Sequence, residues 1–533
     1  MNLVDFTSSS LSLLPPITVL GLAIVTRRIL TSLGIGILLG SILLNDYVLE
    51  KSLNYANITI LNVFVVNGEV NSWNMSILGF LLLLGAMNAL LTLSGGSHAF
   101  ANWAQIRIKS KRGSKLLATF LGLFIFVDDY FNSLAVGSVS RPITDRFYVS
   151  RAKLAYILDS TAAPVCVIIP ISSWGAYAMT IVSGILASHN IIEYSPLNAY
   201  LCLIPMNFYA IFSLLMVFAV VCFQLDIGQM RQHEIDASEG RGFHNYEENQ
   251  FQKMNPKSDL AESNQGKASD LLIPIVFLIV TTISTMLYTG QESLTKDGKE
   301  FEIFKAFENA NMAISLINGA LIGTSLALLS VVKQRVPLHH ILRTVCYGIK
   351  SMLGATLILI FSWTIGIIIN DMKTGIYLSS LVSQVNINVH YLPVILFLLS
   401  GLIAFSTGTS WGTFGIMLPI SGDIANATDI TLILPMLSAV LAGAVFGDHC
   451  SPISDTTILS SIGAKCSHID HVSTQLPYSL SVALVSSIGF LVLGITTSVF
   501  LSISITFAAF IIVCLIFSIL AKSKIVNLRN RRE

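Results

Sequence analysis

The chain has 533 residues, of which 53% are hydrophobic and only 11% are Asp, Glu, Lys or Arg, and its mean hydropathy is +0.73. Soluble domains carry about 25% charged residues, so this composition excludes an ordinary soluble protein and indicates that lipid is the solvent. The net charge of +1 gives no sign of a nucleic-acid partner, and we expect none.

Apolar runs of about 20 residues, the length of a helix that crosses a bilayer, recur along the chain. The basic pair Arg27 and Arg28 follows the first run instead of preceding it, so we expect this run to be retained and not cleaved as a signal peptide. The sequence predicts an all-α polytopic membrane protein with about eleven transmembrane helices. In chain order the predicted spans lie at 11–25, 29–45, 76–93, 154–187, 200–223, 271–288, 311–332, 351–370, 431–463, 476–498 and 503–521.

Two further apolar segments contain polar residues in their middle and do not fit single spans. The segment near 116–140 has basic clusters on both sides, and a single crossing would place one cluster outside, which the positive-inside rule disfavours. We therefore predict a re-entrant hairpin that enters from the cytoplasm, with its tip at 127–133. The segment near 391–420 has the polar stretch 406–410 in its middle and few basic residues, so we predict a re-entrant hairpin from the outside.

Basic residues set the predicted orientation. With the N-terminus outside and the C-terminus in the cytoplasm, all but five of the 31 Lys and Arg residues lie on the cytoplasmic side. The five exceptions are Lys51, Lys296, Lys299, Lys305 and Lys373. We expect a multi-pass protein of the bacterial plasma (inner) membrane with this orientation.

Each half of the chain contains a span, then a hairpin with a polar tip, then a long span with an interruption. The interruptions lie at 164–173 within the first long span, 154–187, and at 447–455 within the second, 431–463. Because one hairpin is cytoplasmic and the other external, the halves form an inverted structural repeat with broken helices, a pattern typical of secondary transporters. The predicted parts are a first transmembrane half (1–223), a polar cytoplasmic linker (224–270), a second transmembrane half (271–521) and a basic cytoplasmic tail (522–533).

Five of the 30 acidic residues lie at membrane depth on this topology, namely Asp128, Asp129, Asp159, Asp448 and Asp455. A carboxylate there costs at least about 2.5 kcal/mol on insertion scales, so each is a candidate for cation or proton binding. If the first tip is helical, Asp128 and Asp129 point about 100° apart, so one can face the site while the other caps the helix start. His449, beside Asp448, is a further candidate proton carrier.

Hydroxyl and amide groups surround these acids, and hard cations such as Na⁺ prefer oxygen ligands of this kind. We predict a Na⁺ site at Asp448, Asp455 and Asp128. The predicted supporting residues are Asn132, Ser160, Thr161, Ser172, Ser173, Thr407, Thr409, Ser451, Ser454 and Thr456. Seven scattered Cys residues without a CxxC pair indicate neither disulfides nor zinc, and we expect no cofactor. The sequence contains no nucleotide-binding P-loop and no K⁺-filter signature.

Four motifs occupy the tip and break positions or follow them: DDYFN (Asp128–Asn132), DSTAAP (Asp159–Pro164), GDHCSPISDTT (Gly447–Thr457) and TQLPY (Thr474–Tyr478). Together they resemble the NhaC-type Na⁺/H⁺ antiporter family of the ion-transporter superfamily, over most of the chain. The resemblance implies a secondary active carrier of the elevator type, often a homodimer, that exchanges Na⁺ for H⁺. It also implies related substrates as alternatives, because relatives with similar motifs are assigned to malate/lactate exchange or amino-acid uptake.

We expect the chain to exchange Na⁺ for H⁺ across the plasma membrane by alternating access, without enzymatic activity. The alternative is a Na⁺-coupled carrier of a small carboxylate or amino acid, by symport or exchange. A channel or an intramembrane hydrolase is disfavoured, because the Ser, His and Asp residues lie in irregular breaks without a nucleophile elbow.

Overall fold

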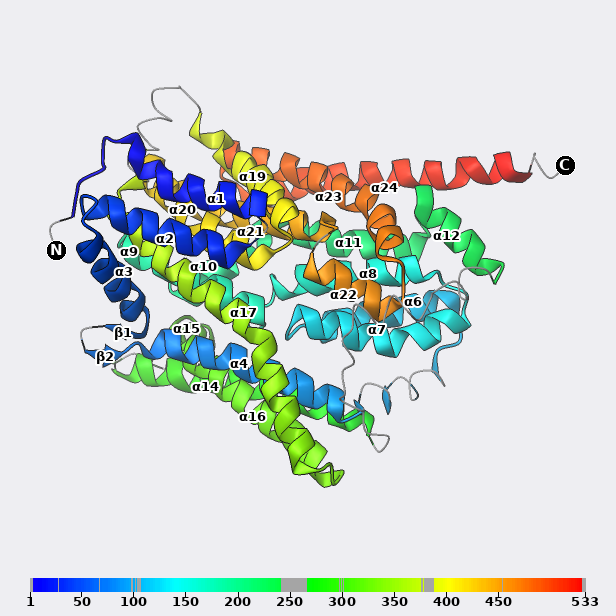
Figure 1. Ribbon diagram of the computed structural model, residues 1–533. Coiled ribbons are helices and arrows are strands. Elements are labelled where there is room, and N and C mark those ends of the chain that lie inside the picture. The colour runs from blue at the N-terminus through cyan, green and yellow to red at the C-terminus, as the bar shows by residue number, and fades with distance from the viewer. Residues whose placement is uncertain are drawn as a thin grey trace.

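The computed structural model describes residues 3–240 and 266–529, apart from 27, 67, 97–98, 101, 103–106, 297, 299, 301, 375–376, 378–387 and 453. The described chain is nearly all helical, as predicted, and its strands form one short antiparallel pair, β1 (Val65–Val66) with β2 (Glu69–Val70). Figure 1 shows long helices running roughly side by side, with α1 (Leu14–Thr26) and the C-terminal helix α24 (Val499–Arg529) along the upper edge of the view.

The helices of the first half include two pairs separated by only a few residues. One pair is α6 (Lys111–Phe124) with α7 (Asp129–Arg146), at the predicted hairpin, and the other is α8 (Arg151–Cys166) with α9 (Ser173–Ser188), at the predicted interruption. The remaining helices are η1 (Ser10–Leu13), α1 (Leu14–Thr26), α2 (Ile29–Leu44), α3 (Leu49–Phe64), α4 (Ser72–Leu93), α10 (Pro196–Leu203), η2 (Ile204–Met206) and α11 (Phe208–Phe223).

The second half contains the same two kinds of pair. Helices α19 (Leu392–Thr407) and α20 (Ser410–Thr428) form the counterpart of the first hairpin, and α21 (Ile433–Cys450) and α22 (Asp455–Ala464) form the second interrupted helix. The other helices are α14 (Ala268–Lys296), α15 (Ile303–Glu308), α16 (Met312–Lys333), α17 (Leu338–Asp371), η3 (Val389–Tyr391), η4 (Ile430–Leu432), α23 (His468–Thr496) and α24 (Val499–Arg529).

Nine helical segments in the described residues are long and apolar enough to cross a membrane. They include helices at eight of the predicted spans, α21 among them, together with α19. The three other predicted spans contain helices that are shorter than 18 residues. Helices α1 and α2 have 13 and 16 residues, and the predicted span 154–187 consists of two 16-residue helices. The chain is a multi-pass membrane protein.

Regions outside the predicted spans are helical too, among them α3 and the predicted tail. The amphipathic helix α3, which the search for apolar runs missed, packs against α2 and α17 and buries Tyr55, whose hydroxyl donates to Asp371. The predicted tail is the end of α24, because no helix-stopping residue separates it from the apolar part; 530–533 lie outside the described residues.

The predicted linker begins with a helix, α12 (Gly228–Ser238), which packs against α8 and α23. Its Glu234 accepts a hydrogen bond from Ser150 N at 2.8 Å and pairs with Lys111 Nζ at 3.0 Å and Lys153 Nζ at 3.4 Å. Lys153, which is completely buried, also pairs with Asp226. These contacts attach the start of the linker to the first hairpin and the first interrupted helix, whereas 241–265 lie outside the described residues.

The packing divides the helices into two groups. We call α2, α3, α4, α14, α16 and α17 the lateral group, because they pack on one another, and α6–α9 with α19–α23 the core group. The groups meet where α17 contacts α20 and where α4 and α17 contact α9. In Figure 1 α4, α14 and α16 lie along the lower edge, whereas α6, α7, α8 and α22 lie together on the right.

Candidate functional site

The tip of the first hairpin is a short extended connection between two helices. Asp128, with φ −155° and ψ 140°, is the N-cap of α7, and its Oδ1 accepts a hydrogen bond from Phe131 N at 3.0 Å. An aspartate is among the best N-cap residues because it satisfies an otherwise unpaired amide. The prediction that one of the adjacent aspartates caps a helix is confirmed, and the residue is Asp128.

This tip is bonded to the break between α8 and α9. Ser173 donates two hydrogen bonds to it, from its backbone nitrogen to Val127 O at 2.9 Å and from its hydroxyl to Asp128 Oδ2 at 3.2 Å. The thiol of Cys166 donates to Phe126 O at 3.3 Å. Ser172 caps α9 by accepting from Gly175 N at 2.8 Å. Tip and break therefore form one hydrogen-bonded unit.

The second half repeats this arrangement. The connection from α19 to α20 turns at Gly408, with φ +71°, a conformation that glycine adopts without a steric penalty. Ser410 donates from its hydroxyl to Asp448 Oδ2 at 3.1 Å, and Ser451 donates to Phe405 O at 2.7 Å. The second tip is thus held by α21 and by the break that follows it.

Both tips line one cavity of about 690 Å³. Tyr130 donates from its hydroxyl to Asp455 Oδ2 at 3.1 Å, a bond between the two halves of the chain. Among the predicted cation ligands, Asp128, Asp129 and Asp455 line the cavity. The wall also contains Arg28, Thr31, Tyr130, Ser351, Thr407, Gly408, Thr409 and Trp411.

Asp129 is the one of these acids without a hydrogen-bonding partner. The residue is 1% exposed, and neither carboxylate oxygen accepts a hydrogen bond of normal length and angle from the described residues. The indole of Trp174, at the start of α9, is its polar neighbour, but the buried Trp174 Nε1 forms no hydrogen bond of normal geometry. A buried carboxylate that is ionised and unpaired costs several kcal/mol, so this group is suited to binding a proton or a cation.

The other predicted acids lie outside the cavity wall. Asp448 is buried and holds the second tip through Ser410. Asp159 belongs to a separate buried network, where its Oδ2 accepts from Gln475 Nε2 at 2.6 Å, Thr457 Oγ1 at 3.1 Å and His471 Nε2 at 3.2 Å. The six predicted titratable residues are therefore divided between a cavity and two buried positions behind it.

His449 lies in the same network as Asp159. Its Nε2 is 2.9 Å from Ser160 Oγ and its Nδ1 is 2.8 Å from Tyr209 OH, and its backbone carbonyl accepts from Gln475. Both ring nitrogens therefore have hydroxyl partners. The network lies outside the cavity wall, because neither His449 nor Asp159 lines the cavity.

Of the predicted supporting residues, only Thr407 and Thr409 line the cavity. Several of the others stabilise the tips and breaks: Asn132 Nδ2 donates to Gly122 O at 2.7 Å and to Thr161 O at 3.1 Å, and Ser454 and Thr456 bond to each other at 2.8 Å. Thr161 donates to Ile157 O within its own helix, as most hydroxyls in membrane helices do.

Sequence reasoning missed several residues of the two sites. Arg28 in the cavity wall served only as an orientation signal, and Ser351 carries no local signal at all. His471 and Gln475, which bind Asp159, lie in or beside the TQLPY motif, so the motif itself was the available signal. Their roles become visible only when α23 packs against α8 and α21.

A model of the Na⁺/H⁺ antiporter family matches residues 165–495 of the chain. The chain is also 51% identical over 501 residues to an uncharacterized protein of Haemophilus influenzae, a match that covers 93% of both chains. The chain belongs to the Na⁺/H⁺ antiporter family. The resemblance seen in the four sequence motifs is confirmed, and the family consists of transporters.

Other relatives of this antiporter family member match shorter parts. The malate-2H⁺/Na⁺-lactate antiporter of Bacillus subtilis is 34% identical over 158 residues, which are 28% of this chain and 32% of that protein. The arginine/ornithine antiporter of Halobacterium salinarum is 35% identical over 98 residues, 18% of this chain and 20% of that one. Among solved structures, the Alcanivorax borkumensis YdaH transporter superimposes with a TM-score of 0.51 at 14% identity, covering 83% of this chain and 88% of that chain, which shows a shared fold.

Proposed function

We propose that the chain exchanges Na⁺ for H⁺ across the membrane by alternating access, with Asp129 as the group that both ions compete for. The observation that carries this proposal is the buried Asp129 carboxylate, which lines a cavity and accepts no hydrogen bond of normal geometry from the described residues. Such a carboxylate is stabilised when it binds either a proton or a cation, and it is costly when it binds neither. Competition for one site is the minimal requirement for obligatory exchange.

The cation shell in this proposal combines few carboxylates with neutral oxygens. No three Asp, Glu, His or Cys side chains converge into a metal site within the described residues. We assign Asp128, Asp129 and Asp455 to the cavity, with Thr407 and Thr409 supplying neutral oxygen, the ligand type that hard cations prefer. In this proposal Asp448 positions the second tip. Asp159 and His449 belong to a buried network that holds a proton.

The membrane arrangement proposed with this mechanism is the one expected from the sequence. It has eleven spans, two re-entrant hairpins in an inverted repeat, an external N-terminus and a cytoplasmic C-terminus in a bacterial inner membrane, and two copies per carrier. Its support is that each hairpin tip is hydrogen-bonded to the break of its own half. On this orientation the cavity, with Arg28 and Ser351 in its wall, opens towards the cytoplasm.

Proton flux in proteoliposomes tests the assignment of Asp129. The purified chain is reconstituted with a pH-sensitive dye inside, and NaCl is added outside. We expect the parent chain to collapse an imposed pH gradient and Asp129→Asn to lower the initial rate at least tenfold. Asp46→Asn is the matched control, because Asp46 is exposed and its φ of 52° is one that Asn also tolerates. Undiminished exchange by Asp129→Asn would contradict the assignment.

A second candidate function is Na⁺-coupled transport of a small carboxylate or amino acid. The observation that favours it is Arg28, since a guanidinium in the wall of a cation cavity is suited to binding a carboxylate. Two relatives that match part of the chain are named for organic substrates, malate with lactate and arginine with ornithine. A flux assay with NaCl as the only added solute separates the two candidate functions. If NaCl alone moves no protons, and adding malate, lactate or arginine starts proton flux, the second function replaces the first.

A further inference from the structure

A second cavity of about 400 Å³ lies away from the acidic cavity and shares no lining residue with it. Its wall is formed by the end of α3, the start of α4 with Asn71 before it, α9, α17 and α20. It therefore lies between the lateral group and the core group of helices. On the proposed orientation it is on the external side, because the loops after α3 and α9 are predicted to be external. This volume is in the range of cavities that hold small organic ligands.

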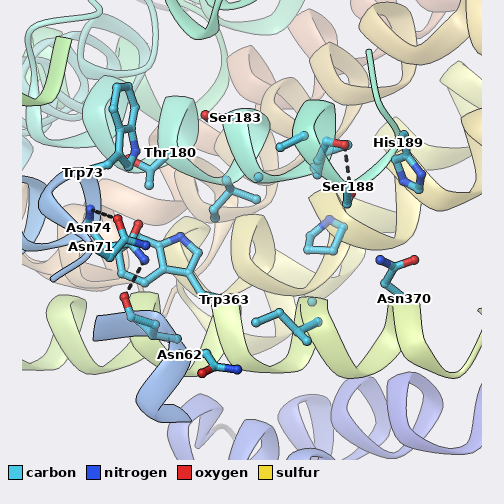
Figure 2. Close-up of a pocket in the computed structure, with 18 of the residues that line it drawn as sticks. Asn62, Asn71, Trp73, Asn74, Thr180, Ser183, Ser188, His189, Trp363 and Asn370 are labelled. Atoms are coloured by element: carbon cyan, nitrogen blue, oxygen red, sulfur yellow. Dashed lines mark hydrogen bonds between the residues drawn. The ribbon is translucent and has the colours of Figure 1, made fainter. Parts of the chain in front are cut away.

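One part of this cavity combines indoles with amides. Trp73 and Trp363 both line it, together with Asn71, Asn74 and, further along, Asn370. Figure 2 shows Trp73, Asn71 and Asn74 on one side of the view, whereas Asn370 and His189 lie on the other. Asn74 is used structurally, since its Nδ2 donates to Val63 O at 2.8 Å. Trp73 Nε1 has no partner among the described residues and is buried.

The charge of the cavity wall is carried by one carboxylate. Asp423 on α20 is its sole acid, and no Lys or Arg lines it. Among the described residues the partner of Asp423 is His189, whose Nε2 lies 3.0 Å from Oδ1, and the two side chains are 7% and 10% exposed for His189 and Asp423 respectively. His189 contacts one oxygen of this carboxylate, Oδ1, and Oδ2 has no partner among the described residues, so it is available to a ligand.

We propose that this cavity binds a small organic ammonium ion. The ammonium group lies against Asp423, and its apolar body packs against the faces of Trp73 and Trp363, which attract cations as well as apolar groups. The side-chain oxygen of Asn370, which lies on the same side of the cavity as His189, accepts a further N–H bond (Figure 2). An organic anion is disfavoured, because it would meet a carboxylate and no basic residue other than His189.

This inference goes beyond the proposed exchange, because the ligand would act without entering the acidic cavity. The two walls of the second cavity belong to different helix groups. Trp73 and Trp363 belong to the lateral group, and Asp423 belongs to the core group. A ligand in contact with both stabilises their present arrangement and opposes any relative movement. The bound ammonium is therefore an inhibitor that acts from the external side.

Calorimetric titration of the full chain in lipid nanodiscs tests the site. The probes are 2-phenylethylammonium, its neutral analogue 2-phenylethanol and the anion 3-phenylpropionate, each corrected by a titration into empty nanodiscs. We expect saturable binding of the ammonium ion with a Kd at least tenfold lower than that of the alcohol, and no measurable binding of the acid. Equal binding of ammonium and alcohol would overturn the proposal.

Variants locate the binding. Asp423→Asn is expected to raise the Kd for the ammonium at least tenfold, whereas His189→Gln, which keeps a donor beside a charged Asp423, changes it less than threefold. Trp363→Leu is a second variant, in case Asp423→Asn does not fold, and is expected to weaken the ammonium more than the alcohol. If Asp423→Asn and Trp363→Leu both bind the ammonium as the parent does, the cavity is not its site.

Asp129→Asn separates this proposal from the proposed exchange. We expect Asp129→Asn to keep ammonium binding intact even though it blocks flux, since the two cavities share no lining residue. Loss of ammonium binding in Asp129→Asn with retention in Asp423→Asn would place the ligand in the acidic cavity and overturn the inference. If the exchange itself were disproved, calorimetry on Asp423→Asn would still decide the ammonium site.

Discussion

Two neighbouring aspartates at the first hairpin tip have different surroundings. Asp128 accepts hydrogen bonds from Phe131 N and from the hydroxyl of Ser173, so its carboxylate stabilises the helix start and the tip. Asp129 accepts none and faces the cavity. The first residue is suited to folding and the second to ion binding, although both carry the same functional group.

Thermal unfolding of alanine variants separates these roles. Asp128→Ala is expected to destabilise the protein by about 1–2 kcal/mol, because a helix cap and a buried hydrogen bond are lost. Asp129→Ala is expected to unfold at or above the temperature of the parent, since no hydrogen bond is lost and a costly buried carboxylate is removed. The measurement is intrinsic fluorescence of the purified chain in detergent; a larger loss for Asp129→Ala would contradict the assignment.

At the scale of single residues, the sequence allowed some of these roles to be predicted. The N-cap preference of aspartate is local, so a cap at Asp128 or Asp129 could be expected, but which of the two it is depends on where α9 lies. The separation of Asp159 and His449 from the cavity could not be predicted, because it depends on α23 supplying Gln475 and His471 from more than 300 residues away.

Among the helices, the close approach of α19 and α21 holds the second tip in place. Gly443 and Gly447 on α21 have no room for a side chain: a Cβ would collide with the carbonyl of Phe397 at the first position and with that of Gly401 at the second. Small residues four apart allow two membrane helices to pack closely. Gly447 directly precedes Asp448, which is bonded to the tip through Ser410.

Gly447→Ala is therefore expected to destabilise the protein by about 1–3 kcal/mol, through overpacking, and to lower Na⁺-driven proton flux. Gly21→Ala is the matched control, because Gly21 is a helical glycine in α1 with no atom within 4 Å of a new Cβ. That control is expected to be neutral or slightly stabilising. Thermal unfolding and liposome flux measure both; a Gly447→Ala protein with parental stability would show that α19 and α21 can separate freely.

Helix α12 provides a second test between elements. Glu234→Gln keeps the side-chain shape but removes the negative charge that Lys111 and the completely buried Lys153 share. We expect the free energy of unfolding to fall by about 2 kcal/mol, which is the contribution of a hydrogen bond to a charged group. Glu193→Gln, at an exposed position between α9 and α10, is the control and is expected to leave the unfolding temperature unchanged. Equal unfolding temperatures for the two variants would contradict an attachment of the linker through Glu234.

In the whole molecule, the two cavities lie on different sides of the contact between the helix groups. The acidic cavity contains residues from the α1–α2 connection and the early part of α17, whereas the second contains residues before α4 and the end of α17. The helices, breaks and tips were predictable because apolar length and polar interruptions are local properties. The cavities were not, because each is enclosed by segments that are distant in the sequence.

Thiol labelling tests the orientation of the molecule. In a Cys346→Ser background, chosen because Cys346 is exposed, Ser351→Cys in the acidic cavity and Asn62→Cys in the second cavity are labelled with a membrane-impermeant maleimide. We expect Ser351→Cys to react in inside-out vesicles and Asn62→Cys in right-side-out vesicles. The unsubstituted background is the control. Reversed labelling would disprove the external N-terminus, and labelling of both from one side would disprove separate openings.

The residues of the acidic cavity also determine how the carrier responds to membrane voltage. Three carboxylates, Asp128, Asp129 and Asp455, face one guanidinium, Arg28; when all are ionised the empty cavity has a formal charge of −2. Moving each unit of charge across the membrane changes the energy by about 2.3 kcal/mol per 100 mV. Two bound monovalent cations would cancel this charge, so the loaded form would cross without electrical work and the voltage would act mainly on the return of the empty form.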